Sequence, residues 1–328
     1  MHDRNKETIK RVLDREKWKQ IDVTNRTQLK LYHIQNNSHD TSKTMDIKIN
    51  NSNSNKFNPA IFSDKQYFVV GAMSTLINLI DEYLQCSRLF PSSSHKILPQ
   101  LIEILKIFNK ETKRLILKAE ARESTAKLPS IAVKHLAVAS QCIELTASLI
   151  PSLRLSLASY MQPKFHSLLD GKSYIYKKYS WYSFFNIVII LVTGMEKIKK
   201  GYNSHKEQLF QKFVELIEDL IDRSFSGAEK EAGPPINTLS WDEPEVTDGE
   251  SDKQHSTRKQ EEVQETSSAM HFFLKKIRIL HKMLSKYLPP IQLQDVFTRI
   301  ISSINTKFPE IYKSVQPMTD IGKQKVCN

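Results

Sequence analysis

The stretch SDKQYFVVGAMSTLINLIDEYL, residues 63–84, carries the strongest structural signal in the sequence. Its apolar side chains recur every three or four residues, which is the spacing that places them on one face of an α-helix. This stripe consists of Tyr67, Val70, Met73, Leu76, Leu79, Ile80 and Tyr83. The side chain of Ser63 or Asp64 is predicted to cap the start of the helix. A helix with such a stripe must bury it against other elements of the fold.

Similar helical patterns occur on both sides of this stretch. They cover residues 5–20, 97–117, 130–149, 164–200, 204–223, 270–288 and 296–308. Pro151 is predicted to end or kink the third of these, because proline lacks the amide hydrogen that a helix needs. Helices in series with mostly short joints are typical of antiparallel bundles and stacked helical rods. The expected fold is therefore all-α, an elongated stack of helical bundles.

Two segments break the helical pattern and contain few apolar residues. Asn and Ser dominate residues 35–56, and a segment with several glycines and prolines carries the acidic run Asp242, Glu243, Glu245, Asp248, Glu250 and Asp252. Such compositions bury too little apolar surface to offset the entropy of ordering, so both segments are predicted to be disordered.

These patterns divide the chain into seven predicted parts. They are an N-terminal helix at 1–24, an Asn/Ser-rich disordered linker at 25–62, a helical bundle at 63–168, further helices at 169–224, an acidic disordered loop at 225–267, a C-terminal helix pair at 268–316 and a tail at 317–328.

Composition narrows the classes of function. Only 8 glycines occur in 328 residues, which disfavours sheet-rich and nucleotide-binding folds that need tight turns. The three cysteines, Cys86, Cys142 and Cys327, have no metal or redox spacing and are expected to be free thiols in a reducing compartment. The first thirty residues contain no apolar segment of a secretory signal, and FFNIVIILV at 184–192 is too short to cross a bilayer.

No catalytic, cofactor-binding or metal-binding motif emerges, so no site residue is predicted and the chain is not expected to be an enzyme. His135, His271 and His281 lie in apolar helical contexts, where a satisfied or exposed histidine is expected rather than a ligand. Glu82 and Glu103 are expected to be solvated on outer helix faces. The serines at 92–94 and 302–303 lack the sequence context of a nucleophile.

The chain has a net charge of +12, and three basic clusters stand out in its sequence. They are Lys110, Lys113, Arg114 and Lys118; Lys197, Lys199 and Lys200; and Lys275, Lys276, Arg278 and Lys282. Each cluster could contact anionic lipid headgroups or simply form a solvated face. Nucleic acid is a third alternative, although none of the common nucleic-acid-binding sequence patterns is present.

Several short segments, in order, resemble the vacuolar protein sorting-associated protein 54 family. LDREKWKQIDV at 13–23 is similar to its L-D-x-E-x-W-K-Q-x-D-V signature, and QYFVVG at 66–71 and EYLQC at 82–86 match two further motifs. LKIFN at 105–109 and KHLAVASQCIEL at 134–145, followed by Ile150-Pro151, continue the match. A looser similarity covers 270–300. The family's glycine-rich motif is replaced here by Lys118-Ala119-Glu120-Ala121.

The resemblance implies a subunit of the Golgi-associated retrograde protein complex, which tethers endosome-derived carriers at the trans-Golgi network. It implies a helical-rod fold of the kind found in multisubunit tethering complexes, and a peripheral position on the cytosolic face of trans-Golgi and endosomal membranes. The expected partners are the other subunits of the complex and, through an N-terminal region that this chain lacks, SNAREs. The basic helix faces could in addition contact an acidic membrane surface.

The same resemblance indicates a C-terminal fragment or a shortened product, with this region helping recruitment to endosomal membranes. Because the corresponding motifs are absent, no cofactor, small-molecule substrate or nucleic-acid partner is expected. The alternative hypothesis is a basic helical scaffold that binds nucleic acid or another protein complex.

Overall fold

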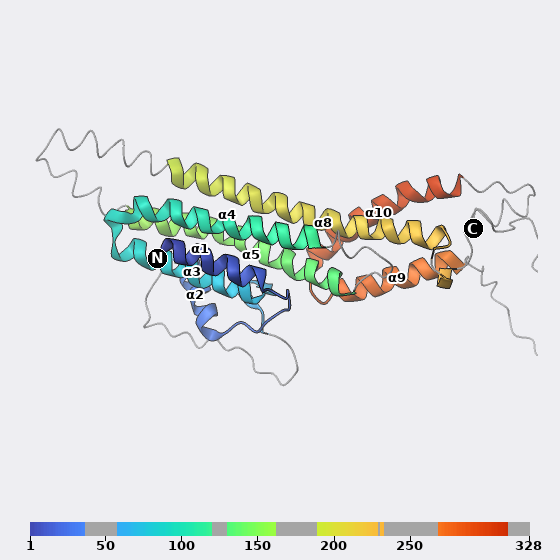
Figure 1. Cartoon of the computed structure of the whole chain (residues 1–328), viewed down its shortest axis with the longest axis horizontal. Coiled ribbons are helices and arrows are strands. Elements are labelled where there is room, and N and C mark those ends of the chain that lie inside the picture. The colour runs from blue at the N-terminus through green and yellow to red at the C-terminus, as the bar shows by residue number, and fades with distance from the viewer. Residues whose placement is uncertain (37–57, 120–129, 162–188, 229, 233–267, 314–328) are drawn as a thin grey trace, which may run out of the picture. The chain divides into compact units, whose positions relative to one another are not determined.

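The computed structural model describes residues 1–36, 58–119, 130–161, 189–228, 230–232 and 268–313 (Figure 1). The chain divides into two compact units, Met1–Phe210 and Gln211–Asn328. The described residues are predominantly helical, which confirms the predicted helical-bundle class. Helix α8, Met195–Phe225, contributes its first half to one unit and its second half to the other.

The first unit is a bundle of helices that pack along their lengths. Its main elements are α1 (His2–Asp14), α2 (Asn25–Asn36), α3 (Gly71–Leu89), α4 (Ser94–Ala119) and α5 (Ser130–Met161). A short 3-10 turn, η1 (Pro91–Ser93), joins α3 to α4, and the π-helical turn η3 (Ile190–Gly194) leads into α8. Helix α3 contacts α1, α2, α4 and α5, so the stripe first seen in the sequence lies at the centre of this unit.

Helix α5 is the most apolar of the described α-helices. By length and composition its segment Val133–Tyr160 could cross a membrane, yet 78% of the most apolar window is buried in the bundle, as in the core helix of a folded domain. Pro151 was predicted to end or kink this helix, and it does not end it, because α5 continues to Met161. Buried Leu153 and Leu157 extend its apolar face, and their burial offsets the hydrogen bond that the proline removes.

A small antiparallel hairpin precedes α3, and the all-α prediction missed it. Strand β1 (Ala60–Phe62) pairs with β2 (Lys65–Tyr67), and Ser63 and Asp64 form the turn with φ of 49° and 62°. Left-handed conformations at both central positions are typical of a tight hairpin turn. Neither residue therefore caps the helix as predicted, and α3 begins at Gly71 with Val70 at the N-cap.

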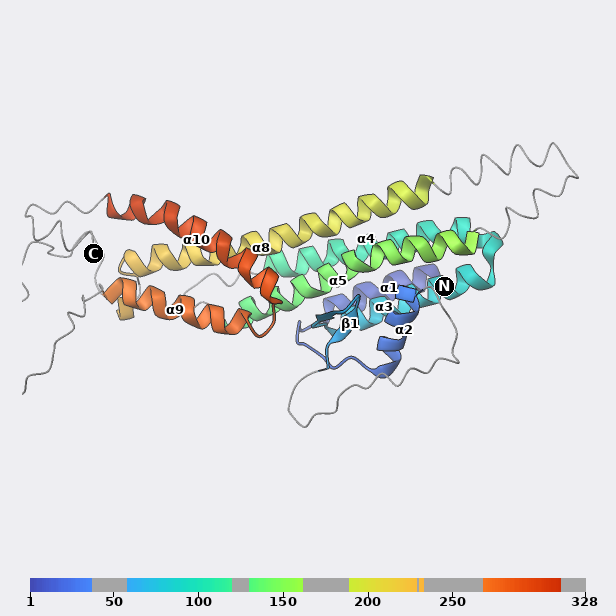
Figure 2. The same ribbon diagram turned by 180° about the vertical axis from the view of Figure 1, so that it is seen from behind.

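The predicted linker at 25–62 is partly wrong, because its first twelve residues form helix α2. Leu31 and Ile34 are buried, and the hairpin packs beside this helix (Figure 2). The Lys30 ammonium group lies 3.3 Å from the carboxylate of buried Asp81 on α3. The central part of that linker, most of the helix predicted at 164–200, and the acidic run lie outside the described residues.

The second unit contains the second half of α8, the 3-10 turn η4 (Lys230–Ala232), α9 (Ser268–Leu284) and α10 (Pro290–Tyr312). Four aromatic rings join these helices. Phe308 lies 5.4 Å from Phe225 and 5.5 Å from Phe273 between ring centroids, and Tyr312 lies 6.4 Å from Phe225. Edge-to-face packing of this kind adds to the stabilisation that burial provides.

Candidate functional site

The segment 13–23 forms a joint between the N-terminal helix and the start of α3. One carboxylate oxygen of Glu16 accepts a hydrogen bond of 2.7 Å from the amide of Ala72, and the other accepts one of 3.2 Å from the amide of Trp18. The first amides of a helix have no partner within it, and a negative charge there also interacts favourably with the helix dipole. Glu16 therefore caps α3 from a distant part of the chain.

Gly71 leaves room for this contact. A Cβ atom at position 71 would lie 3.2 Å from the Glu16 carboxylate, closer than most side-chain contacts allow. The last residue of the QYFVVG segment and the fourth residue of LDREKWKQIDV thus meet at one point.

The rest of this joint is made by backbone pairing. The amide of Ile21 donates to the carbonyl oxygen of Val69 at 2.9 Å, while the Asp22 carboxylate accepts from the amide of Asn58 at 2.8 Å. Trp18 has φ of 53° and a buried ring, which turns the chain between α1 and this pairing. These hydrogen bonds and this turn hold the N-terminal segment on the bundle.

A polar cluster links α1 to α3 and α4. With the proton on Nε2, the His2 ring donates to Glu103 at 3.0 Å and accepts at Nδ1 from the Tyr83 hydroxyl at 2.7 Å. The His2 hydrogen bond, followed by that of Lys6, lowers the pKa of Glu103, while burial raises the pKa of Tyr83. Glu82 accepts a hydrogen bond from Asn5 at 3.4 Å. Glu82 and Glu103 are therefore exposed, as expected, and they also connect helices through these hydrogen bonds.

The LKIFN segment holds the first half of α8. The hydroxyl of Tyr202 donates to the carbonyl oxygen of Leu105 at 2.7 Å, and Nδ1 of His205 lies 2.7 Å from the side-chain oxygen of Asn109. Burial, together with the nearby charge of Lys113, lowers the pKa of His205 to about 4. The ring is thus neutral at physiological pH, and its Nδ1–H donates to Asn109.

The Nε2 atom of His205 is buried and has no hydrogen-bond partner in the described part of the chain. Sequence reasoning did not identify Tyr202 or His205, because their partners lie about 96 residues away. Their spacing of three residues on one helical face was the available signal.

The KHLAVASQCIEL segment lies in the interior of the first unit. Burial raises the pKa of Cys142 to about 12, so its thiol remains protonated and unreactive. Leu145 is fully buried, and Glu144 lies 3.6 Å from the Lys206 ammonium group. The family-like segments as a group therefore connect helices, and they do not form an open reactive cleft.

The three basic clusters differ in their surroundings. In the first, Lys110 and Lys113 are exposed, but Arg114 pairs with Asp14 at 2.8 Å and with Glu111 at 2.6 Å. In the second, Lys197 and Lys200 are exposed beside Glu196. The third lies on α9, where no acidic residue interrupts it.

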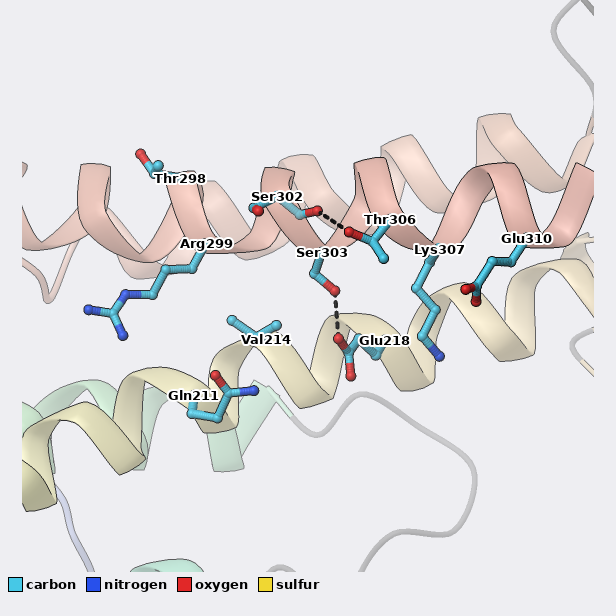
Figure 3. Close-up of a pocket in the computed structure, with 10 residues that line it drawn as sticks. All are labelled: Gln211, Val214, Glu218, Thr298, Arg299, Ser302, Ser303, Thr306, Lys307 and Glu310. Carbon is cyan, nitrogen blue, oxygen red and sulfur yellow. Dashed lines mark hydrogen bonds between the residues drawn. The ribbon is translucent and has the colours of Figure 1, made fainter.

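A groove of about 520 Å³, lined by polar and apolar side chains, lies between α8 and α10 in the second unit (Figure 3). The hydroxyl of Ser303 donates to the Glu218 carboxylate at 2.6 Å, and the hydroxyl of Thr306 donates to the backbone oxygen of Ser302 at 3.1 Å. The residues that line the groove include no histidine or cysteine, and Lys307 is paired with Asp222 at 3.1 Å. These contacts stabilise the helix pair, and they do not activate a serine for nucleophilic attack.

Metal ligands are not gathered anywhere in the described ranges, where no group of three or more histidine, cysteine or acidic side chains occurs. His271 and His281 are exposed, and the His281 ring packs edge-on against Phe297 at 4.9 Å. Among the serines, Ser94 is buried and donates to the carbonyl oxygen of Ser87.

Comparisons with known proteins agree with the pattern of motifs. A family model described as Vps54-like protein matches residues 64–183. The chain is similar to vacuolar protein sorting-associated protein 54 of Homo sapiens, with 25% identity over 98% of this chain and 27% of the human protein. Corresponding proteins of Arabidopsis thaliana and Caenorhabditis elegans share 22% and 33% identity, over 79% and 34% of this chain and 21% and 10% of their own lengths.

The chain thus spans about a quarter of the length of the human relative. No solved structure gives a significant match.

Proposed function

Because the chain belongs to the Vps54 family, we propose that it acts in the Golgi-associated retrograde protein complex, as a helical region of the subunit that tethers endosome-derived carriers at the trans-Golgi network. The Vps54 family is a family of tethering subunits and not of enzymes. In this role the two helical units present surfaces to the other subunits and to membranes.

One observation carries the proposal: the family similarity extends along 98% of the chain, and its motif residues are those that join the helices. Glu16 holds the start of α3, and Asn109 holds α8 through His205. A tethering subunit needs a scaffold of this kind, because it acts through contacts spread over a rigid surface.

Co-purification tests the proposal. The tagged protein, expressed at its native level in its own cells, is expected to capture the other subunits of the complex and to localise to trans-Golgi and endosomal membranes. A tagged protein that is folded and helical, yet captures none of these subunits and stays away from both membranes, would rule the proposal out.

A further inference from the structure

Helix α9 has a charge composition unlike that of its neighbours in the second unit. It carries Lys275, Lys276, Arg278 and Lys282 and contains no aspartate or glutamate. In α10, by contrast, acidic and basic residues are balanced, with Arg299 bound to Asp295 at 3.1 Å. No acidic residue within α9 therefore balances its positive charge.

The cations of α9 also lack anionic partners among the described residues. Within the residues that the structure describes, none of its three lysines nor Arg278 forms an ion pair, whereas Lys307 on α10 pairs with Asp222 on α8. Lys276 is the least exposed of the four, because its ammonium group lies 4.8 Å over the ring of Phe272. The other three are exposed and have no anionic partner among the described residues.

Helical geometry gathers these cations into one row. Steps of three and four residues place His271, Lys275, Arg278 and Lys282 on a single exposed face. The opposite face is anchored in the unit by Phe272, Phe273, Leu280 and Leu284, all of which are buried. The row is thus presented by a helix whose orientation is fixed within its own unit.

Two apolar side chains flank this row. Leu274 is 39% exposed and Ile279 is 50% exposed, and the 100° turn per residue places them on opposite sides of Arg278. Apolar residues beside a solvated row of cations cost free energy in water. Their transfer to the boundary between the headgroups and the acyl chains of a bilayer lowers the free energy.

We propose that this face of α9 binds the surface of an anionic lipid membrane. Lys275, Arg278 and Lys282 contact headgroup phosphates and carboxylates, while Leu274 and Ile279 enter the interfacial layer. Long basic side chains suit this arrangement, since their stems lie along apolar surface while their charged ends reach the headgroups. A nucleic acid would satisfy the cations but would leave the two apolar side chains in water, so a bilayer fits the face better.

The proposal adds a membrane-contact face to the proposed function. Flotation of the purified full chain with vesicles tests membrane binding in the absence of the other subunits. The membrane proposal can therefore fail while co-purification with the subunits succeeds, and co-purification can fail while membrane binding is observed. Vesicles of phosphatidylcholine with about 30% phosphatidylserine are expected to carry the chain upward, and pure phosphatidylcholine vesicles are not. Raising the salt concentration is expected to weaken the binding, since exposed charges are screened.

Two triple variants locate the binding face. Lys275→Gln, Arg278→Gln and Lys282→Gln together are expected to lower partitioning about 100-fold, at about fivefold for each cation near the surface. The matched control, Lys106→Gln, Lys110→Gln and Lys113→Gln on α4, removes the same charge from exposed positions and is expected to lower it less than about threefold.

A third variant separates lipid from other polyanions. Leu274→Ser with Ile279→Ser keeps every charge and is expected to lower vesicle binding severalfold, while leaving weak retention on a DNA oligonucleotide unchanged. Circular dichroism confirms that each variant is folded; if the triple α9 variant unfolds, the single variant Arg278→Gln takes its place, with an expected loss of about fivefold. Equal losses for the α4 and α9 triples, or tight DNA binding without vesicle binding, would overturn the proposal.

Discussion

His205 offers a sharp test of how α4 holds α8. Its side chain is 1% exposed, its Nδ1 atom binds Asn109, and its pKa is lowered to about 4. Burial is the main cause, because an imidazolium ion loses its hydration in the interior, and the charge of Lys113 adds to the effect. In the unfolded chain the same side chain has an ordinary pKa of about 6.5.

Between these two pKa values the unfolded chain binds a proton that the folded chain does not, so acid stabilises the unfolded state. The contribution of neutral His205 is complete above about pH 6.5 and is lost as the pH falls toward about 4. The linkage relation gives a loss of about 2 kcal/mol at about pH 5 compared with about pH 7.5.

Urea denaturation at these two pH values, followed by helical circular dichroism and by tryptophan fluorescence, to which buried Trp18 contributes, measures this loss. His205→Gln removes the titrating group, so the free energy of unfolding of the variant is expected to fall less between the two pH values, by about 2 kcal/mol. Groups such as Glu103 titrate in both proteins and cancel in the comparison. A difference below about 0.5 kcal/mol would refute the buried, neutral histidine.

Three further substitutions test the packing. Leu145→Ala is expected to lower the free energy of unfolding by about 2–5 kcal/mol in urea titrations. The control Leu155→Ala, at a site 64% exposed, is expected to change it by less than about 0.5 kcal/mol. Equal effects of the two substitutions would contradict the burial of Leu145. Glu16→Ala is expected to cost about 1 kcal/mol and to speed hydrogen exchange at the Ala72 amide, and unchanged exchange there would refute the cap. Phe273→Ala is expected to cost about 3–5 kcal/mol by calorimetry, and a loss under about 1 kcal/mol would exclude the aromatic cluster as part of the core.

Much of the first unit could be predicted because its helices carry strong local signals. The apolar stripe of α3 is buried as its periodicity indicates, from Met73 through Tyr83. Elements whose stability depends on distant partners were missed. Helix α2 looks polar in isolation, and its position depends on buried Leu31 and on the pairing of Lys30 with Asp81, 51 residues away along the chain.

Local rules also failed where packing overrides them. Pro151 is a helix breaker by propensity, but Leu153 and Leu157 keep α5 continuous beyond it. Ser63 and Asp64 are favourable capping residues in sequence, yet the pairing of β1 with β2 uses them as a turn.

The candidate contact face was only partly visible in the sequence. The sequence alone did not distinguish the three basic clusters as candidates for lipid binding. In the structure, Arg114 of the first cluster pairs with Asp14 and Glu111, which distinguishes this cluster from the one on α9. The exposure of Leu274 and Ile279 beside the α9 cations required the packing of the second unit.

Membrane recruitment of a core-weakened variant tests the central claim most directly, namely that this helical scaffold supports a subunit of a tethering complex. In cells that express only the Leu145→Ala variant, the fraction of the protein on endosomal and trans-Golgi membranes is expected to fall well below that of Leu155→Ala at equal abundance. Undiminished recruitment of a Leu145→Ala protein that is demonstrably less stable would contradict the account.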